Sequence, residues 1–247
     1  MSLKDSMKQS PFVRSTYLRL FSGQARIRYA VGNFLARRTH LYFSVYRNEI
    51  SVSAKIDESA WIAPKGVRIG ERCIIGPHAV IHEKTVLDDE VVIGAGSVVS
   101  SEGFVAKRFG NKTVSIIHVG GVHIHKRTIV GQNCGIDKAT TKTWTELGED
   151  SHIGDCVHIA HNVILGKRNQ IASHVMIAGH VDTGEDVHIG EGASITDSIR
   201  IGTDVMIAAG AVVTREVPDH SRLAGNFAID ERRLKEFASL VVQETRG

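Results

Sequence analysis

Two histidines three residues apart, in the run His158-Ile159-Ala160-His161-Asn162, are the strongest candidates for chemistry in this chain. An imidazole has a pKa near ~6.5 and can accept a proton at neutral pH. Gly179 follows His161 by eighteen residues and is itself followed by His180. A backbone N–H beside a general base can stabilise the negative charge that develops on a carbonyl oxygen during acyl transfer. The pattern therefore favours an acyl-transfer site with His161 as the base and Gly179 as the oxyanion donor.

The spacing of eighteen residues is meaningful because the chain repeats every six residues. A period of six fits neither a 3.6-residue helix nor a two-residue strand alternation, and it is typical of a parallel β-helix. Three hexads form one triangular coil, so the Gly179 N–H is expected one strand spacing, ~4.8 Å, above His161. We call the residue that begins each six-residue step and is expected to point inward an anchor. Only Thr183 is not aliphatic among the twelve anchors from 147 to 213, which are Leu147, Ile153, Ile159, Leu165, Ile171, Ile177, Thr183, Ile189, Ile195, Ile201, Ile207 and Val213.

The same repeat predicts an all-β solenoid, a left-handed parallel β-helix of seven or eight coils over residues 50–215. The hexads begin at Ile50, slip by one residue near Gly66, and fail between 100 and 121 and again between 137 and 146. Such excursions from a rigid scaffold commonly carry binding groups. Residues 216–247 are expected to form a loop and a helix that caps the open end of the solenoid.

Residues 1–49 are expected to form basic amphipathic helices. Residues 1–50 carry nine Lys or Arg against two acidic residues, a net charge of +7, while the whole chain is +3. The apolar faces of these helices would pack on the solenoid, or they would contact an anionic membrane surface or an acidic carrier protein. No apolar run is long enough to span a membrane, and no signal-peptide core is present, so we expect a cytoplasmic protein, with peripheral contact to the inner membrane as the finer alternative.

Four short motifs add a family resemblance: Glu102-Gly103-Phe104, Gly120-Gly121-Val122, Gly135-Ile136-Asp137 and Ile159-Ala160-His161-Asn162-Val163. With them, residues 55–228 resemble the left-handed β-helix acyltransferases, and most closely the UDP-3-O-acylglucosamine N-acyltransferases of lipid A biosynthesis. The resemblance implies that His161 is the general base and Gly179 the oxyanion donor. It also implies substrate contacts by Phe104, Asp137 and Asn162, and a homotrimer with sites between neighbouring subunits.

The chain departs from that family in several places. Gly154 stands where the family has an Asp seven residues before the base, and the acid is shifted to Asp155, which we retain as a candidate partner of His161. The first fifty residues show no counterpart of the family's N-terminal uridine-binding domain. The sister O-acyltransferases have similar His-x-Ala-His and Ala-Gly-His runs, which implies substrate contacts for His158 and His180.

The ending Gly225-Asn226-Phe227-Ala228 resembles that of acetyl-CoA-dependent hexapeptide transferases, with Phe227 in place of proline. This favours acyl-CoA as the donor, and an acyl-carrier protein stays open. We expect no cofactor beyond that co-substrate, no metal and no nucleic acid, since no recognised nucleic-acid-binding module is present. The three cysteines fit neither a disulfide framework nor a zinc ribbon.

The leading interpretation is an acyltransferase that moves an acyl group from a thioester to the amine of a nucleotide-linked amino sugar in cell-envelope polysaccharide or lipopolysaccharide biosynthesis. A hydroxyl acceptor stays open. One alternative is a non-catalytic β-helix scaffold or membrane-surface protein. Another is a γ-class carbonic anhydrase with zinc on His82, His118 and His123, whose separations of 36 and 5 residues resemble that class. The broken repeat between 99 and 124 counts against it, and these three and His125 are otherwise interpreted as surface histidines.

Overall fold

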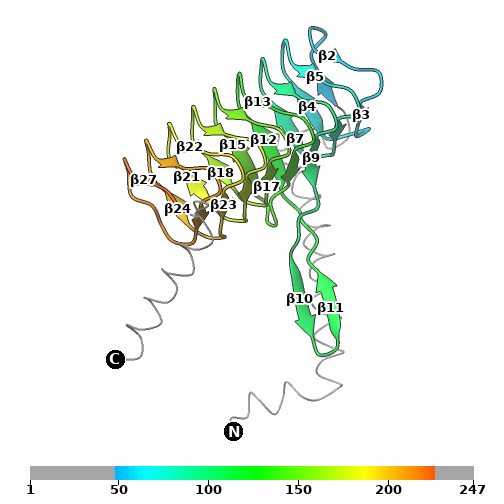
Figure 1. Cartoon of the computed structure of the whole chain (residues 1–247). Coiled ribbons are helices and arrows are strands. Elements are labelled where there is room, and N and C mark those ends of the chain that lie inside the picture. The colour runs from blue at the N-terminus through cyan, green and yellow to red at the C-terminus, as the bar shows by residue number, and fades with distance from the viewer. Residues whose placement is uncertain (1–47, 226–247) are drawn as a thin grey trace, which may run out of the picture.

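A computed structural model describes residues 48–225 of the chain. Within this range every regular element is a β-strand, and the strands wind into a parallel β-helix with three faces (Figure 1). The first sheet contains β1 (Glu49–Ile50), β4 (Val67–Ile69), β7 (Thr85–Leu87), β12 (Gly121–Ile124), β15 (Trp144–Leu147), β18 (Ile164–Leu165), β21 (Asp182–Thr183) and β24 (Arg200–Ile201).

The other two sheets form the remaining faces of the prism. The second sheet contains β2 (Lys55–Ile56), β5 (Ile74–Ile75), β8 (Val92–Ile93), β13 (Ile129–Val130), β16 (His152–Ile153), β19 (Gln170–Ile171), β22 (His188–Ile189), β25 (Met206–Ile207) and β27 (Arg222–Leu223). The third sheet contains β3 (Trp61–Ile62), β6 (Val80–Ile81), β9 (Val98–Ser101), β14 (Gly135–Asp137), β17 (His158–Ile159), β20 (Met176–Ile177), β23 (Ser194–Ile195) and β26 (Val212–Val213).

The predicted coil of eighteen residues is confirmed by the strand register. Strand β17 pairs in parallel with β20, and Ile159 lies opposite Ile177. Both side chains are completely buried, as are most of the other anchors. Removing a large aliphatic side chain from water contributes about 1.5–3 kcal/mol, so a column of stacked anchors is a strong reason for the chain to keep its six-residue period.

The corners between the sheets rely on left-handed backbone conformations. Asn162 and His180 have φ angles of 60° and 59°, and a residue of this kind recurs every six positions along the regular coils. This conformation costs a residue other than glycine about 1–2 kcal/mol. Hydrogen bonds between coils offset the cost, since His180 N–H donates to the His161 carbonyl at 3.0 Å and His174 N–H donates to the Asp155 carbonyl at 2.9 Å. The corners thereby hold their side chains in a fixed direction.

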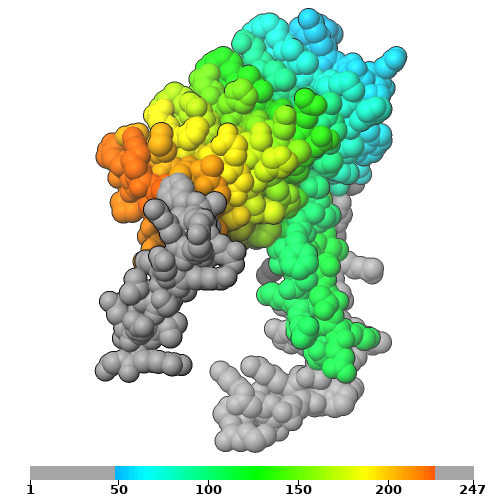
Figure 2. Space-filling view, in the orientation of Figure 1, coloured from blue at the N-terminus to red at the C-terminus, as the bar shows by residue number. Residues whose placement is uncertain are grey.

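Both interruptions of the repeat leave the β-helix at the same corner, between the third and first sheets. The first follows β9 and contains the antiparallel hairpin of β10 (Ala106–Phe109) and β11 (Lys112–Ser115). This hairpin projects from the body of the β-helix as a narrow arm (Figures 1 and 2). The second interruption follows β14, one coil later. Because β17 comes next in the same sheet, both excursions begin close to the corner that carries His161.

The β-helix continues beyond its predicted C-terminal boundary, and the helices predicted at the two termini are not tested. Strand β27 pairs with β25, with Leu223 opposite Ile207, so sheet pairing continues past the expected boundary at residue 215. The expected basic helices and most of the C-terminal segment, including its capping helix, lie outside the described residues. Residues 48–225 contain no helix that is long and apolar enough to cross a membrane.

Candidate active site

His161 lies directly against Gly179 of the next coil. A Cβ atom added to Gly179 would stand 2.8 Å from His161 Nε2 and 2.9 Å from Nδ1, closer than real side-chain contacts allow. Only glycine therefore lets the imidazole take this position. Gly179 is buried, and within residues 48–225 its backbone N–H donates to no other group. The juxtaposition expected from the eighteen-residue coil is present.

Three imidazole rings meet at this corner. The ring centroid of His161 is 5.3 Å from that of His118 and 5.1 Å from that of His180. Burial lowers the pKa of His161 below its usual value, and the positive charge that His118 and His180 can carry lowers it further. The environment of His161 therefore favours the neutral ring. Its Nδ1 atom is buried and has no hydrogen-bond partner in the described part of the chain.

The prediction that His118 is a surface residue is wrong. The residue is only 2% exposed, and both its backbone N–H and its ring Nδ1 contact Glu102 Oε2, at 3.0 and 3.2 Å. Lys138 holds the other oxygen of Glu102 through an ion pair of 2.6 Å. The two excursions, 102–120 and 138–143, are thus linked at their bases beside His161. The repeat stops before His118, so no periodic signal could have placed it there.

Asp137 and His158 form a second pair near the same corner. Asp137 is buried, its Oδ1 accepts a hydrogen bond of 2.8 Å from the Ser101 hydroxyl, and its Oδ2 lies 3.3 Å from His158 Nε2. The hydrogen bond with Asp137 raises the pKa of His158 above its usual value. His158 and His161 therefore differ in environment although both follow from one sequence motif. The first favours the charged ring and the second favours the neutral one.

Asn162 uses its side chain within the protein. Its Oδ1 accepts hydrogen bonds from the Thr140 N–H at 2.9 Å and the Thr140 hydroxyl at 2.7 Å, and its Nδ2 donates to the Thr143 hydroxyl at 2.9 Å. The amide thereby fastens the 138–143 excursion to the corner of His161. These bonds give Asn162 a role in positioning the loop, and its contact with substrate stays a prediction.

The two remaining predicted site residues, Phe104 and Asp155, lie in different parts of the β-helix. Phe104 is 90% exposed and lies just before β10 of the hairpin, and its contact with substrate stays a prediction. Asp155 is at another corner, between the second and third sheets, where its Oδ1 accepts a hydrogen bond of 2.7 Å from the Gln132 N–H. The structure therefore brings His158, His180, Asp137 and Asn162 to the corner of His161 and does not bring Asp155 there.

A cavity of about 290 Å³ opens at the same corner, toward the N-terminal end of the β-helix. The Trp61 and His82 rings meet in a T-shaped arrangement there, with centroids 5.5 Å apart. Glu102 and Lys138 belong both to this cavity and to the support of His118. Its lining consists of Trp61, Ala63, Pro64, Lys65, His82, Glu83, Ser100, Ser101, Glu102 and Lys138.

The three histidines considered for a γ-class carbonic anhydrase, which in that class come from neighbouring subunits, do not meet within one chain. His82 and His118 belong to the corner between the third and first sheets, whereas His123 lies on β12 in the first sheet. Among residues 48–225, the group with metal-ligating geometry is a different one, formed by Asp88, His123 and His125.

Comparison with known proteins supports the fold and points to one group of relatives. The bacterial transferase hexapeptide family, described by six repeats, matches residues 66–101, 145–179 and 180–215. UDP-3-O-acylglucosamine N-acyltransferase 1 of Gloeobacter violaceus is 50% identical over 139 residues, which cover 56% of this chain and 40% of that protein. UDP-3-O-acylglucosamine N-acyltransferase of Anaeromyxobacter dehalogenans is 32% identical over 116 residues, covering 44% of this chain and 32% of that protein.

Solved structures give the same fold. A UDP-N-acetylglucosamine acyltransferase from Bacteroides fragilis has a TM-score of 0.56 at 21% identity, covering 71% of both chains. The UDP-N-acetylglucosamine O-acyltransferase of Moraxella catarrhalis has a TM-score of 0.53 at 23% identity, covering 77% of this chain and 76% of the other. These similarities confirm the left-handed parallel β-helix. The matched segments span 40% or less of the length of the two curated relatives.

Proposed function

We propose that this chain, which matches the bacterial transferase hexapeptide family over three segments between residues 66 and 215, is an acyltransferase. It would acylate the amine of a nucleotide-linked amino sugar in cell-envelope or lipopolysaccharide biosynthesis. The acyl donor is a thioester, either acyl-CoA or acyl-carrier protein. The relatives named as N-acyltransferases of UDP-3-O-acylglucosamine support this choice of acceptor. We place the reaction in the cytoplasm, with peripheral contact to the inner membrane as the finer form of the proposal.

The close approach of the His161 ring to Gly179 is the observation that carries the proposal. A general base must be unprotonated at the working pH, and burial lowers the pKa of His161 in that direction. An oxyanion donor must have a free N–H beside the reacting carbonyl, and the Gly179 amide makes no hydrogen bond within the described residues. The eighteen-residue coil holds both groups on rigid backbone, so neither has to be ordered during the reaction.

The reaction balances with these two groups. The sugar amine attacks the thioester carbonyl carbon, a C–N bond forms, and His161 takes the proton that nitrogen loses. The carbonyl oxygen becomes an oxyanion that accepts a hydrogen bond from Gly179 N–H. The C–S bond then breaks, and the imidazolium of His161 returns its proton to the departing thiolate. One base of this kind typically contributes ~10²–10⁴-fold to the rate.

The proposal includes a homotrimer. A convex prism has no deep cleft of its own, and the cavity at the candidate corner is open. A neighbouring copy laid along this corner would enclose His161 and supply a wall for the substrate. His158, His180, Phe104 and Asp137 are the residues that we assign to contact with the sugar or the acyl group.

Replacement of His161 tests the function directly. The full-length protein is assayed for thiol release from acyl-CoA and from acyl-carrier protein, with a panel of nucleotide-linked amino sugars. We expect His161→Ala to lower turnover by ~10²–10⁴-fold with an unchanged circular dichroism spectrum. The matched control is His152→Ala, since His152 is exposed on β16 in the second sheet. Full turnover by His161→Ala would refute the assignment of the base.

A further inference from the structure

A second group of histidines gathers on the outer face of the first sheet, away from the corner of His161. His123 and His125 flank Ile124 at the end of β12, and Ile124 is completely buried in the core. Successive side chains of a strand point to opposite faces, so the two histidines share the outer face. Their ring centroids are 4.0 Å apart.

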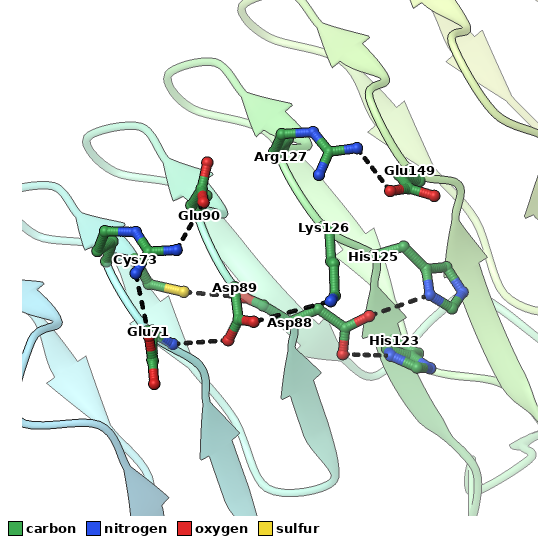
Figure 3. Close-up of polar contacts among 11 residues, drawn as sticks. Glu71, Cys73, Asp88, Asp89, Glu90, His123, His125, Lys126, Arg127 and Glu149 are labelled. Atoms are coloured by element: carbon green, nitrogen blue, oxygen red, sulfur yellow. Dashed lines mark hydrogen bonds and ion pairs between the residues drawn. The ribbon is translucent and has the colours of Figure 1, made fainter.

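The parallel register brings two carboxylates to these rings from the neighbouring coils. On one side, β7 pairs with β12 with Leu87 opposite Ile124, which places Asp88 beside His125. On the other side, β15 pairs with β12 with Glu146 opposite His123. Asp88 thereby reaches both histidines, with Oδ1 3.0 Å from His123 Nε2 and Oδ2 3.2 Å from His125 Nδ1 (Figure 3).

The His125 ring is held between two carboxylates. Its Nδ1 faces Asp88, and its Nε2 lies 3.3 Å from Glu146 Oε2. A carboxylate only accepts hydrogen bonds, and a neutral imidazole has one N–H to donate. If Nε2–H is donated to Glu146, the lone pair of Nδ1 points at Asp88, and a cation placed between them satisfies both. This arrangement resembles the carboxylate–histidine–metal unit in which the carboxylate orients the ring.

We propose that Asp88, His123 and His125 bind a divalent transition-metal ion of the zinc class, with Glu146 orienting His125. The three donor atoms all lie within 4.8 Å of one another. Metal bonds of about 2.0–2.2 Å in a tetrahedral arrangement separate the ligand atoms by ~3.3 Å. Asp88 Oδ1 lies 3.0 Å from His123 Nε2, and Asp88 Oδ2 lies 3.2 Å from His125 Nδ1, so each ring nitrogen stands slightly closer than this to one of the two carboxylate oxygens. Two imidazole donors select zinc over the oxygen-preferring magnesium and calcium.

Charge and exposure also fit a bound dication. Asp88 and Glu146 provide two negative charges, and Lys126 forms its ion pair, of 3.9 Å, with the neighbouring Asp89 (Figure 3). The side chains of Asp88, His123 and His125 are 28%, 26% and 32% exposed. The donors are thus partly shielded by the sheet and open to solvent on one side, where a water molecule completes the coordination.

The position of the site indicates a structural role. Asp88 precedes the long excursion that carries the hairpin, and His123 and His125 follow it. A metal ion bound to all three would join the coil before the excursion to the coil after it, and metal affinity for the folded state adds to stability. No residue of this cluster belongs to the candidate active site, so zinc binding does not depend on the proposed acyltransferase activity.

Zinc titration of the metal-free, tag-free, full-length protein tests the proposal. Cys156 is an exposed free thiol, so all variants carry Cys156→Ser to remove an adventitious ligand. Calorimetry should show saturable binding of one zinc ion per chain, with a rise in melting temperature that magnesium does not cause. Glu146→Gln should weaken binding by ~10–100-fold. His152→Ala serves as the matched control and should bind as the parent does.

The double variant His123→Ala/His125→Ala should lose this binding and the rise in melting temperature. Should that variant fail to fold, Asp88→Asn keeps the shape of the side chain and should also abolish saturable binding. Absence of zinc binding by the parent protein would overturn the proposal, as would equal binding by a folded variant that lacks these ligands. In either case the cluster would be an ion-pair network without a metal.

Discussion

Asn169 and Thr183 are hydrogen bonded to each other inside the β-helix, through Asn169 Nδ2 and Thr183 Oγ1 at 2.6 Å. Asn169 is completely buried, and it also donates to the Gly184 carbonyl at 3.1 Å and accepts from the Val187 N–H at 2.7 Å. Thr183 Oγ1 accepts a further bond of 3.1 Å from Gly166 N–H. Thr183, the one anchor that is not aliphatic, thus accepts a hydrogen bond from the buried side-chain amide of Asn169.

Thr183→Val restores an aliphatic anchor to the repeat, yet we expect it to destabilise the protein. The change leaves the Asn169 amide with an unmade hydrogen bond in the core, which costs about 1–3 kcal/mol of unfolding free energy. Urea denaturation followed by circular dichroism measures the difference. Thr183→Ser keeps the hydroxyl and is the matched control. A Val variant as stable as the parent would show that the hydrogen bond between Thr183 and Asn169 makes no net contribution.

Gly179→Ala should impair catalysis by displacing His161. The new methyl group would stand 2.8 Å from His161 Nε2, so the ring must move. A displacement of about 1 Å at a reacting group can lower the rate by ~10²-fold, and we expect a fall in kcat of this order. His152→Ala is the control, because His152 is exposed on β16 in the second sheet. Unchanged kcat in Gly179→Ala would argue against His161 as the base.

The fall of kcat/KM on the acid side of its pH profile should reflect the pKa of His161. Its pKa is lowered mainly by burial, so kcat/KM should fall only as the pH drops below the usual histidine value of ~6.5. His180 lowers the same pKa by charge repulsion. His180→Asn should therefore raise the pKa of His161 and move this fall to higher pH. An acid-side fall above pH ~7 in the parent would contradict a neutral, buried base.

Asp137→Asn should change how stability depends on pH. Asp137 raises the pKa of His158 in the folded state, so this pair adds stability below the unfolded pKa of ~6.5 and loses it as the pH rises through the folded pKa. The loss of unfolding free energy in Asp137→Asn should consequently be larger at pH ~5.5 than at pH ~8. His158→Asn should show the same dependence on pH. An equal loss at both values would mean that the pair is not charged in the native state.

Much of the fold and the centre of the site could be predicted because the six-residue pattern determines which residues of successive coils become neighbours. An aliphatic residue at every sixth position must point inward, and three such steps complete one coil, so residues eighteen apart become neighbours. That relation alone places Gly179 beside His161. It also places Asn162 and His180 at the same corner, one coil apart.

The tertiary structure decided what the interruptions bring together. The excursion after β9 changes the separation of neighbouring coils from eighteen residues to thirty-seven, so that Leu87 lies opposite Ile124. No period of the sequence predicts that path, and for this reason the burial of His118 against His161 and the meeting of Asp88 with His123 were not foreseen. The sequence by itself determined the coil and the pair of His161 and Gly179. Only the folded chain, where loops without a repeat are set by their own contacts, decided which side chains surround that pair.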